Sequence, residues 1–139
     1  MTELAFVDTN VLLYAFDTGE PAKRRRADRV LRELGSQRAV ISPQVLSEFY
    51  VNVQRLAEPL AQPEARLAVE RLARLRTVPL DSDRVLEALA IQDRWQTSYW
   101  DALIFAAAAA AGCAEVFSED LQHGQTIAGV QIVNPFVGL

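Results

Sequence analysis

Apolar residues in this chain form short continuous runs, and these runs alternate with longer stretches in which apolar positions recur every three or four residues. Short apolar runs are typical of strands buried on both faces of a sheet, and the longer periodicity is typical of amphipathic helices. The runs predict strands at residues 4–7, 39–41, 78–80, 115–118 and 130–133. Because proline lacks a backbone donor, Pro79 places the third of these strands at an edge of the sheet.

The periodic stretches predict helices at residues 11–14, 21–34, 63–75 and 99–111, a fifth helix that begins at Pro43, and a sixth that follows Asp81 or Ser82. Ser42 is expected to cap the helix at Pro43, since a serine side chain can accept a hydrogen bond from a free backbone N–H group. Gly35 and Gly112 are expected to end the helices that precede them.

Strands that alternate with helices indicate an α/β fold, in which helices cover a mainly parallel central sheet. The sequence contains no linker, repeat or disordered stretch, and 139 residues, half of them apolar, suffice for a substantial core. We therefore expect a single domain over residues 1–139.

Composition narrows the range of functions. The formal net charge of −4 is opposite to that of a generally basic nucleic-acid binder, so a nucleic-acid partner would have to meet a local basic patch. The longest apolar run, residues 102–111, is shorter than the roughly 20 residues that span a bilayer. Residues 1–4 contain no basic stretch ahead of an apolar run, so no signal peptide is expected. Because Cys113 is the only cysteine, no internal disulfide can form, and we expect a reducing, cytoplasmic location.

Four acidic residues lie where strand or helix ends would direct them toward one place: Asp8, Glu48, Asp101 and Asp120. Asp8 follows the first predicted strand and Asp120 follows a later one, and the carboxyl ends of parallel strands share one edge of the sheet. Asp101 lies in the first turn of a predicted helix, and Glu48 lies one to two turns into another. Because clustered carboxylates repel one another, folds that gather them usually do so around divalent cations, which are common in enzymes that cut phosphodiester bonds.

Each of these acids also has a purely structural explanation. Asp8 could cap the helix that follows it, and Asp101 could simply occupy the positive end of a helix dipole. Glu48 could be an exposed helix charge, and Asp120 could cap a turn before Gly124. The hypothesis of convergence therefore rests on all four acids falling at the same edge of the sheet.

Four segments, in this order and spacing, resemble the motifs of PIN-domain nucleases: Asp8-Thr9-Asn10 after an apolar strand, Ser47-Glu48-Phe49 in a helix, Tyr99-Trp100-Asp101-Ala102-Leu103-Ile104, and Ser118-Glu119-Asp120-Leu121. The resemblance covers nearly the whole chain. Within that family the chain is most similar to the VapC-type toxins of bacterial toxin–antitoxin modules, in residues 118–125 and in the ending at residues 132–136.

The resemblance implies a three-layer α/β/α PIN fold and an endoribonuclease that depends on Mg²⁺ or Mn²⁺, cleaves RNA and is blocked by a cognate antitoxin protein. By motif position it implies that the catalytic, metal-binding acids are Asp8, Glu48, Asp101 and Asp120, and that the supporting polar residues are Thr9, Asn10 and Ser118. The chain departs from the commonest pattern at Glu119, where asparagine is frequent. That departure leaves open a fifth carboxylate at the metal.

Contact with RNA requires positive charge, and the densest basic run in the chain contains Arg24, Arg25 and Arg26. This run is either a solvated helix face or a patch that follows the phosphates of RNA. Trp95 and Trp100 could stack on bases, but packing in the core is the favoured interpretation. The apolar segment at residues 56–75 would serve equally as core or as the contact surface of a partner, and a homodimer is expected.

Rival interpretations come from other classes of protein. An aspartate after the first strand also suits receiver domains or haloacid-dehalogenase-like phosphatases, but those phosphatases require a second aspartate where Asn10 stands, and receivers require a lysine late in the sheet. The only lysine here is Lys23, and the only histidine is His123, which argues against a zinc site. A PIN-like module that binds RNA or protein without cutting is the alternative function.

Overall fold

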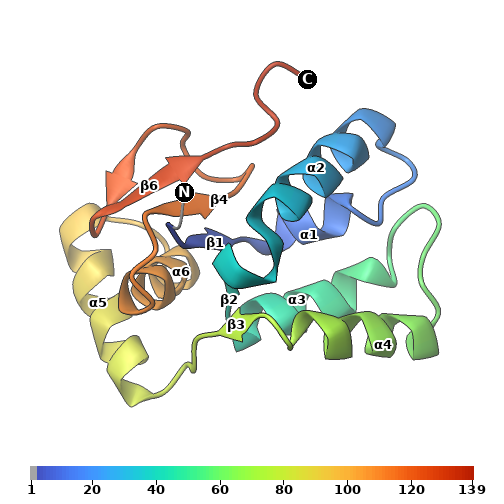
Figure 1. The fold of residues 1–139 in the computed structure, drawn as a ribbon. Coiled ribbons are helices and arrows are strands. Elements are labelled where there is room, and N and C mark those ends of the chain that lie inside the picture. The colour runs from blue at the N-terminus through green and yellow to red at the C-terminus, as the bar shows by residue number, and fades with distance from the viewer. Residues whose placement is uncertain (1–2) are drawn as a thin grey trace.

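A computed structural model describes residues 3–139. Met1 and Thr2, on which the expectation about a signal peptide partly rests, lie outside the described residues. One sheet is built from six strands (Figure 1): β1 (Ala5–Val7), β2 (Ala39–Ile41), β3 (Arg76–Thr77), β4 (Glu115–Phe117), β5 (Thr126–Ile127) and β6 (Val130–Val133). The helices of the described part are α1 (Thr9–Tyr14), α2 (Pro21–Arg38), α3 (Pro43–Val53), α4 (Gln62–Leu72), α5 (Ser82–Trp95) and α6 (Tyr99–Ala110).

The strands lie in the order β3-β2-β1-β4-β6-β5, and every pair is parallel except β5 with β6. The chain steps in one direction from β1 to β2 to β3 and then returns across the sheet to β4. Because such crossovers are right-handed, α1 to α4 cover one face and α5 and α6 cover the other. Figure 1 shows this separation of α1 and α2 from α5 and α6. The predicted α/β/α architecture with a mainly parallel sheet is confirmed.

The reversal of strand order between β1 and β4 leaves a crevice beyond their carboxyl ends, where ligands of open α/β sheets usually bind. Of the two strands beside this crevice, all three residues of β1 are buried, and Val116 at the centre of β4 is buried. Residues 102–108 of α6 form a continuous buried run, and four of the seven are alanines. Because alanine side chains are short, α6 lies close against the sheet, where it contacts β2, β4 and β6.

Three local predictions need correction. The edge strand β3 is Arg76–Thr77 and precedes the predicted residues 78–80. Val78 N–H donates the last bond of the ladder, to the Ile41 carbonyl, and Pro79 has no N–H group with which to continue it. Ser42 occupies the N-cap position of α3, but its side chain makes no capping hydrogen bond. Gly35 breaks the helical conformation at φ 64°, as expected, yet the helix resumes and continues to Arg38.

Strand β5 was not predicted. It forms a hairpin with β6 whose two-residue turn, Ala128-Gly129, has positive φ angles of 51° and 80°. Such turns are usually marked by asparagine or aspartate before glycine, and an alanine there gives no signal.

No helix within residues 3–139 is both long enough and apolar enough to cross a bilayer. Cys113 is buried at 6% exposure, and burial raises the pKa of its thiol to about 11. Cys113 therefore packs as a small buried hydrophobe.

Candidate active site

A pocket of about 340 Å³ opens at the crevice between the ends of β1 and β4. Its lining contains Asp8, Glu48, Asp101 and Asp120, together with Thr9, Asn10, Leu13, Gln44, Asn52, Trp100 and Ile104. The structure thus brings the four acids of the sequence hypothesis to one hollow, from the end of β1, the middle of α3, the first turn of α6 and the loop after β4.

Asp8 is the most buried of the four acids, with 7% of its surface exposed. It is the N-cap of α1, since its Oδ1 accepts a hydrogen bond from Thr9 N–H at 2.8 Å, and its Oδ2 accepts one from Ser118 Oγ at 2.8 Å. Burial raises the pKa of Asp8 to about 6, and the nearby charges of Glu48 and Asp120 add to that rise, although the two hydrogen bonds oppose it. Asp8 therefore caps α1 and also lines the pocket, so the structural explanation as a helix cap and the functional explanation as a member of the acidic cluster both apply.

Thr9 joins α1 to α3 through a side-chain contact. Its Oγ1 donates to Glu48 Oε1 at 2.9 Å, and Asn52 Nδ2 donates to the Glu48 carbonyl at 2.8 Å. Thr9 itself is buried, whereas Glu48 is exposed. One oxygen of the Glu48 carboxylate is thereby held at the wall of the pocket.

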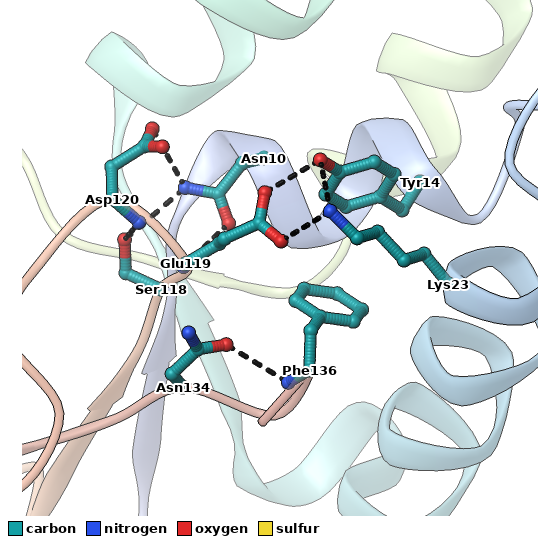
Figure 2. A network of polar contacts seen from close by, with 8 residues as sticks. All are labelled: Asn10, Tyr14, Lys23, Ser118, Glu119, Asp120, Asn134 and Phe136. Atoms are coloured by element: carbon teal, nitrogen blue, oxygen red, sulfur yellow. Dashed lines mark hydrogen bonds and ion pairs between the residues drawn. The ribbon is translucent and has the colours of Figure 1, made fainter. Parts of the chain in front are cut away.

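Asn10 connects the ends of β1 and β4 (Figure 2). Glu119 N–H donates to Asn10 Oδ1 at 3.0 Å, and because a backbone N–H can only donate, this contact assigns the amide oxygen. The amide nitrogen of Asn10 then faces three acceptors: Asp8 Oδ2 at 3.3 Å, Ser118 Oγ at 3.1 Å and Asp120 Oδ2 at 3.2 Å. A neutral donor thus lies between two of the acids.

Ser118 is fully buried and links the same groups. Its hydroxyl donates to Asp8 and accepts from Asp120 N–H at 3.2 Å. Asp101 approaches from the opposite layer, in the first turn of α6. There Ser98 caps the helix by accepting from Asp101 N–H at 3.1 Å, and the positive end of the helix dipole favours the Asp101 carboxylate.

Glu119 does not line the pocket. Its side chain accepts from Tyr14 Oη at 2.5 Å and pairs with Lys23 Nζ at 2.7 Å, and Figure 2 shows it pointing away from Asp120. Burial raises the pKa of Glu119, but the hydrogen bonds from Lys23 and Tyr14 outweigh it and hold the pKa below its usual value.

The three arginines of the basic run have different surroundings. Arg24 and Arg25 are exposed and line a hollow of about 330 Å³ near the start of α2. Arg26 is partly buried, and its Nη1 donates to the Pro135 carbonyl at 2.6 Å. Only the first two present free guanidinium surface to solvent.

Trp100 corrects the expectation of core packing for this residue. It is 63% exposed, lies edge-on to Tyr99 at a centroid distance of 5.1 Å, and lines the pocket. Sequence reasoning also missed Gln44 and Asn52, polar residues of α3 that lie near Glu48 in the chain. Helical spacing from Glu48 is the signal that could have found both, since they lie four residues before and after it.

The donor set suits a hard divalent cation. Carboxylate and amide oxygens are the ligands that Mg²⁺ and Mn²⁺ prefer. Among residues 3–139, none of the four acids forms an ion pair with lysine or arginine, and Gln44 Oε1 is buried without a hydrogen-bond partner. The same part of the chain holds no group of three or more His, Cys, Asp or Glu side chains already arranged to hold an ion. Binding would therefore draw the carboxylates closer together.

Solved structures with the same fold come from bacterial toxin–antitoxin systems. A toxin–antitoxin complex from Klebsiella pneumoniae matches with a TM-score of 0.72 at 23% identity, covering 95% of this chain and 98% of that one. VapC20 of Mycobacterium tuberculosis, a toxin that cleaves the sarcin–ricin loop, matches with a TM-score of 0.66 at 19% identity, covering 91% and 98%. DNA-bound VapBC from Salmonella typhimurium matches with a TM-score of 0.64 at 21% identity, covering 94% and 96%.

No match was found among curated protein sequences. The family model of the PIN domain, however, matches residues 5–126, a span that runs from β1 to the start of β5 and includes all four acids of the pocket. The chain belongs to the PIN-domain family.

Proposed function

We propose that the protein is an endoribonuclease that depends on a divalent cation and acts as the toxin of a toxin–antitoxin pair. The observation that carries the proposal is the pocket at the reversal point of the sheet, which four carboxylates from separate elements line without a basic partner in the described chain. Membership of the PIN-domain family and a fold shared with toxins that cleave RNA support it.

We assign Mg²⁺ or Mn²⁺ as the cofactor, held by Asp8, Glu48, Asp101 and Asp120. Such an ion, when bound, supplies an activated water nucleophile and offsets the charge of the phosphate. The chain's own polar residues fix the acids that hold it. Thr9 holds one oxygen of Glu48, Ser118 holds Asp8, and Asn10 lies between Asp8 and Asp120.

Two exposed surfaces offer contact to RNA, one at the pocket and one in the separate hollow at the start of α2. Trp100 is exposed beside the acids and presents an aromatic face on which a base can stack. Arg24 and Arg25 offer planar guanidinium groups that suit phosphate. Since Arg26 is engaged with Pro135, we assign RNA contact to Arg24 and Arg25 alone.

We assign the antitoxin contact to the apolar side of α4. A hollow of about 400 Å³ lies there, between the end of α1 and α4, and its lining includes the exposed side chains of Phe16 and Leu67 as well as Leu60 and Leu72. Apart from Phe16, this surface falls within the apolar segment at residues 56–75, for which core and partner contact are both expected. The homodimer stays a prediction.

Cleavage of RNA in the presence and absence of the cation tests the proposal. Wild-type protein should cut RNA with Mg²⁺ or Mn²⁺ and not with EDTA, and Asp8→Asn should abolish cutting. Because water is the nucleophile, sequencing of the products should find 5′-phosphate and 3′-hydroxyl ends. Products that end in 2′,3′-cyclic phosphate would contradict the mechanism.

A binding module that holds RNA without cutting it is the second candidate. The observation in its favour is that the acids of residues 3–139 are not yet arranged to hold an ion. If wild type and Asp8→Asn bind RNA equally well and show no difference in cleavage with or without the cation, this candidate would be favoured over the nuclease.

A further inference from the structure

Lys23, Glu119 and Tyr14 form a compact polar cluster beside the pocket, which we call the clasp. Lys23 Nζ lies 2.7 Å from Glu119 Oε2 and donates to Tyr14 Oη at 3.2 Å, while Tyr14 Oη donates to Glu119 Oε1 at 2.5 Å. Lys23 also lies over the Tyr14 ring, 4.8 Å from its centroid. Each member therefore contacts both of the others, and three segments of the chain meet at one point (Figure 2).

The clasp is shielded from solvent more than an ordinary surface ion pair. The side chains of Lys23 and Glu119 are 27% and 23% exposed, whereas those of Arg32 and Asp28, which pair on the solvent side of α2, are 80% and 56% exposed. Phe136 is buried against Tyr14, with ring centroids 4.9 Å apart. Reduced solvent screening makes such a pair stiffer than an exposed one.

The backbone of Glu119 connects the clasp to the acids. Its N–H donates to Asn10 Oδ1 and so sets the direction of the Asn10 amide, which donates in turn toward Asp8 and Asp120. The side chain of Glu119 fixes this residue on α1 and α2, and its backbone fixes Asn10. The contacts form one continuous path from Lys23 to the two acids.

We propose that the clasp is a positioning device and that Glu119 is not a metal ligand: its pairing with Lys23 and Tyr14 holds residues 118–120 so that Asp8 and Asp120 face a common cation. The inference rests on the proposed function in so far as it assumes a cation in the pocket. It deepens that function by assigning Lys23 and Tyr14, which lie outside the pocket lining, to the support of the site.

Rotation of Glu119 into the pocket would break both of its side-chain contacts. It would also leave Lys23, a half-buried ammonium group, without its carboxylate partner. Loss of a charged partner from a partly buried site is costly, so the observed direction of Glu119 is the favoured one.

Binding of Mn²⁺, followed by electron paramagnetic resonance in the absence of RNA, tests the inference independently of cleavage. The double variant Lys23→Met/Glu119→Gln removes the ion pair without changing net charge, and we expect it to weaken Mn²⁺ binding about tenfold, the lower end of the range for groups that support metal ligands. The charge-swapped variant Lys23→Glu/Glu119→Lys should recover most of the lost affinity. Glu119→Gln alone keeps an acceptor for Tyr14 but leaves Lys23 without its carboxylate, so it should weaken Mn²⁺ binding about as much as the double variant does and far less than Asp8→Asn does.

The matched control is Arg84→Met/Glu87→Gln, which removes a comparable pair on α5 at unchanged net charge and should leave Mn²⁺ binding unaltered. If the clasp double variant does not fold, Tyr14→Phe removes a single hydroxyl and should shift Mn²⁺ affinity in the same direction.

Unaltered Mn²⁺ affinity in the folded clasp variants would overturn the inference, as would a loss in Glu119→Gln as large as that in Asp8→Asn, which would make Glu119 a ligand. Wild-type protein that binds Mn²⁺ but cuts no RNA would contradict the proposed function and leave this inference testable. Wild-type protein that binds no Mn²⁺ would overturn both.

Discussion

The amide nitrogen of Asn10 lies 3.2 Å from Asp120 Oδ2, and the two residues are 110 positions apart in the chain. The same nitrogen lies 3.3 Å from Asp8 Oδ2, so one neutral donor separates two acids that would otherwise face each other directly. In a pocket without a cation, this donor reduces the repulsion between them.

Replacement of Asn10 by aspartate keeps the shape of the side chain but replaces its donor with a further negative charge. We expect Asn10→Asp to lower the free energy of unfolding of the metal-free protein by about 2 kcal/mol, because three acceptors lose their donor and like charges crowd together. Mn²⁺ should restore much of this loss. Thermal melting with and without Mn²⁺ checks the prediction, and equal melting temperatures for wild type and variant without metal would contradict it.

Asp8→Asn should make the metal-free protein more stable at neutral pH while it abolishes activity. The folded-state pKa of Asp8 is about 6 against an ordinary value of 3.8, so the stability that protonated Asp8 contributes is fully present below pH 3.8 and is lost as pH rises through about 6. The full difference corresponds to on the order of 3 kcal/mol. Because the one amide oxygen of asparagine cannot replace both carboxylate oxygens, which accept from Thr9 N–H and from Ser118 Oγ, we expect a net gain of about 1–2 kcal/mol.

Urea unfolding at several pH values measures this difference. The gain should vanish toward pH 4, and Asp93→Asn, at an exposed site on α5, serves as the control. A gain that persists at low pH would show that the buried charge is not its cause.

Two serines with no exposed surface provide a matched pair. Ser118→Ala removes one donor to Asp8 and one acceptor for Asn10 and Asp120 N–H, and we expect it to cost about 2–3 kcal/mol. Ser42 Oγ has no hydrogen-bond partner among residues 3–139, so Ser42→Ala should be neutral or stabilise the protein by up to about 1 kcal/mol. Denaturant unfolding compares them, and similar costs for both variants would refute the network assigned to Ser118.

Trp100→Ala should weaken RNA binding with little effect on folding, because most of this side chain is exposed. Loss of one stacked base corresponds to about 1–3 kcal/mol, and we expect the KM for RNA to rise at least about fivefold while kcat changes less. Trp100→Phe should retain part of the affinity. Leu86→Ala is the control, because Leu86 lies on α5 and is as exposed as Trp100, at 63%. An unchanged KM would exclude stacking on Trp100.

Charge reversal at Arg24 and Arg25 should raise the KM for RNA and flatten its dependence on salt, since each lost phosphate contact reduces the number of released counterions. Arg32→Glu is a stringent control, because Arg32 lies on the same helix and is already paired with Asp28 at 2.8 Å. Cleavage rates measured from low to high salt test this prediction. Equal salt dependence in all three proteins would remove RNA contact from this face of α2.

Much of the site could be predicted because its acids follow from topology. Asp8 stands directly after a buried apolar run, and in parallel sheets that position fixes both the edge and the side from which a residue approaches. The capping signals around Ser98 place Asp101 in a first turn in the same way. Such features depend on local sequence and on the handedness of crossovers, which are both readable without coordinates.

The remainder depends on contacts between distant segments. Nothing near Glu119 in the chain reveals that Lys23 and Tyr14 will hold it, so sequence alone left open whether it faces the cation. Trp100 illustrates a second limit. An aromatic residue in the first turn of a helix shows the same pattern whether it packs inward or faces solvent, and the packing of α5 and Tyr99 decides between them.

The row of alanines on α6 has an effect beyond close packing. It sets the distance between the helix axis and the sheet, and Asp101 stands at the end of that helix. A bulkier residue at Ala106 or Ala107, deep in the interior, would act like a wedge and lift the acid away from the strand ends. The width of the catalytic opening is therefore adjustable from a layer that neither RNA nor metal ever touches, and variants with altered ion preference should arise there.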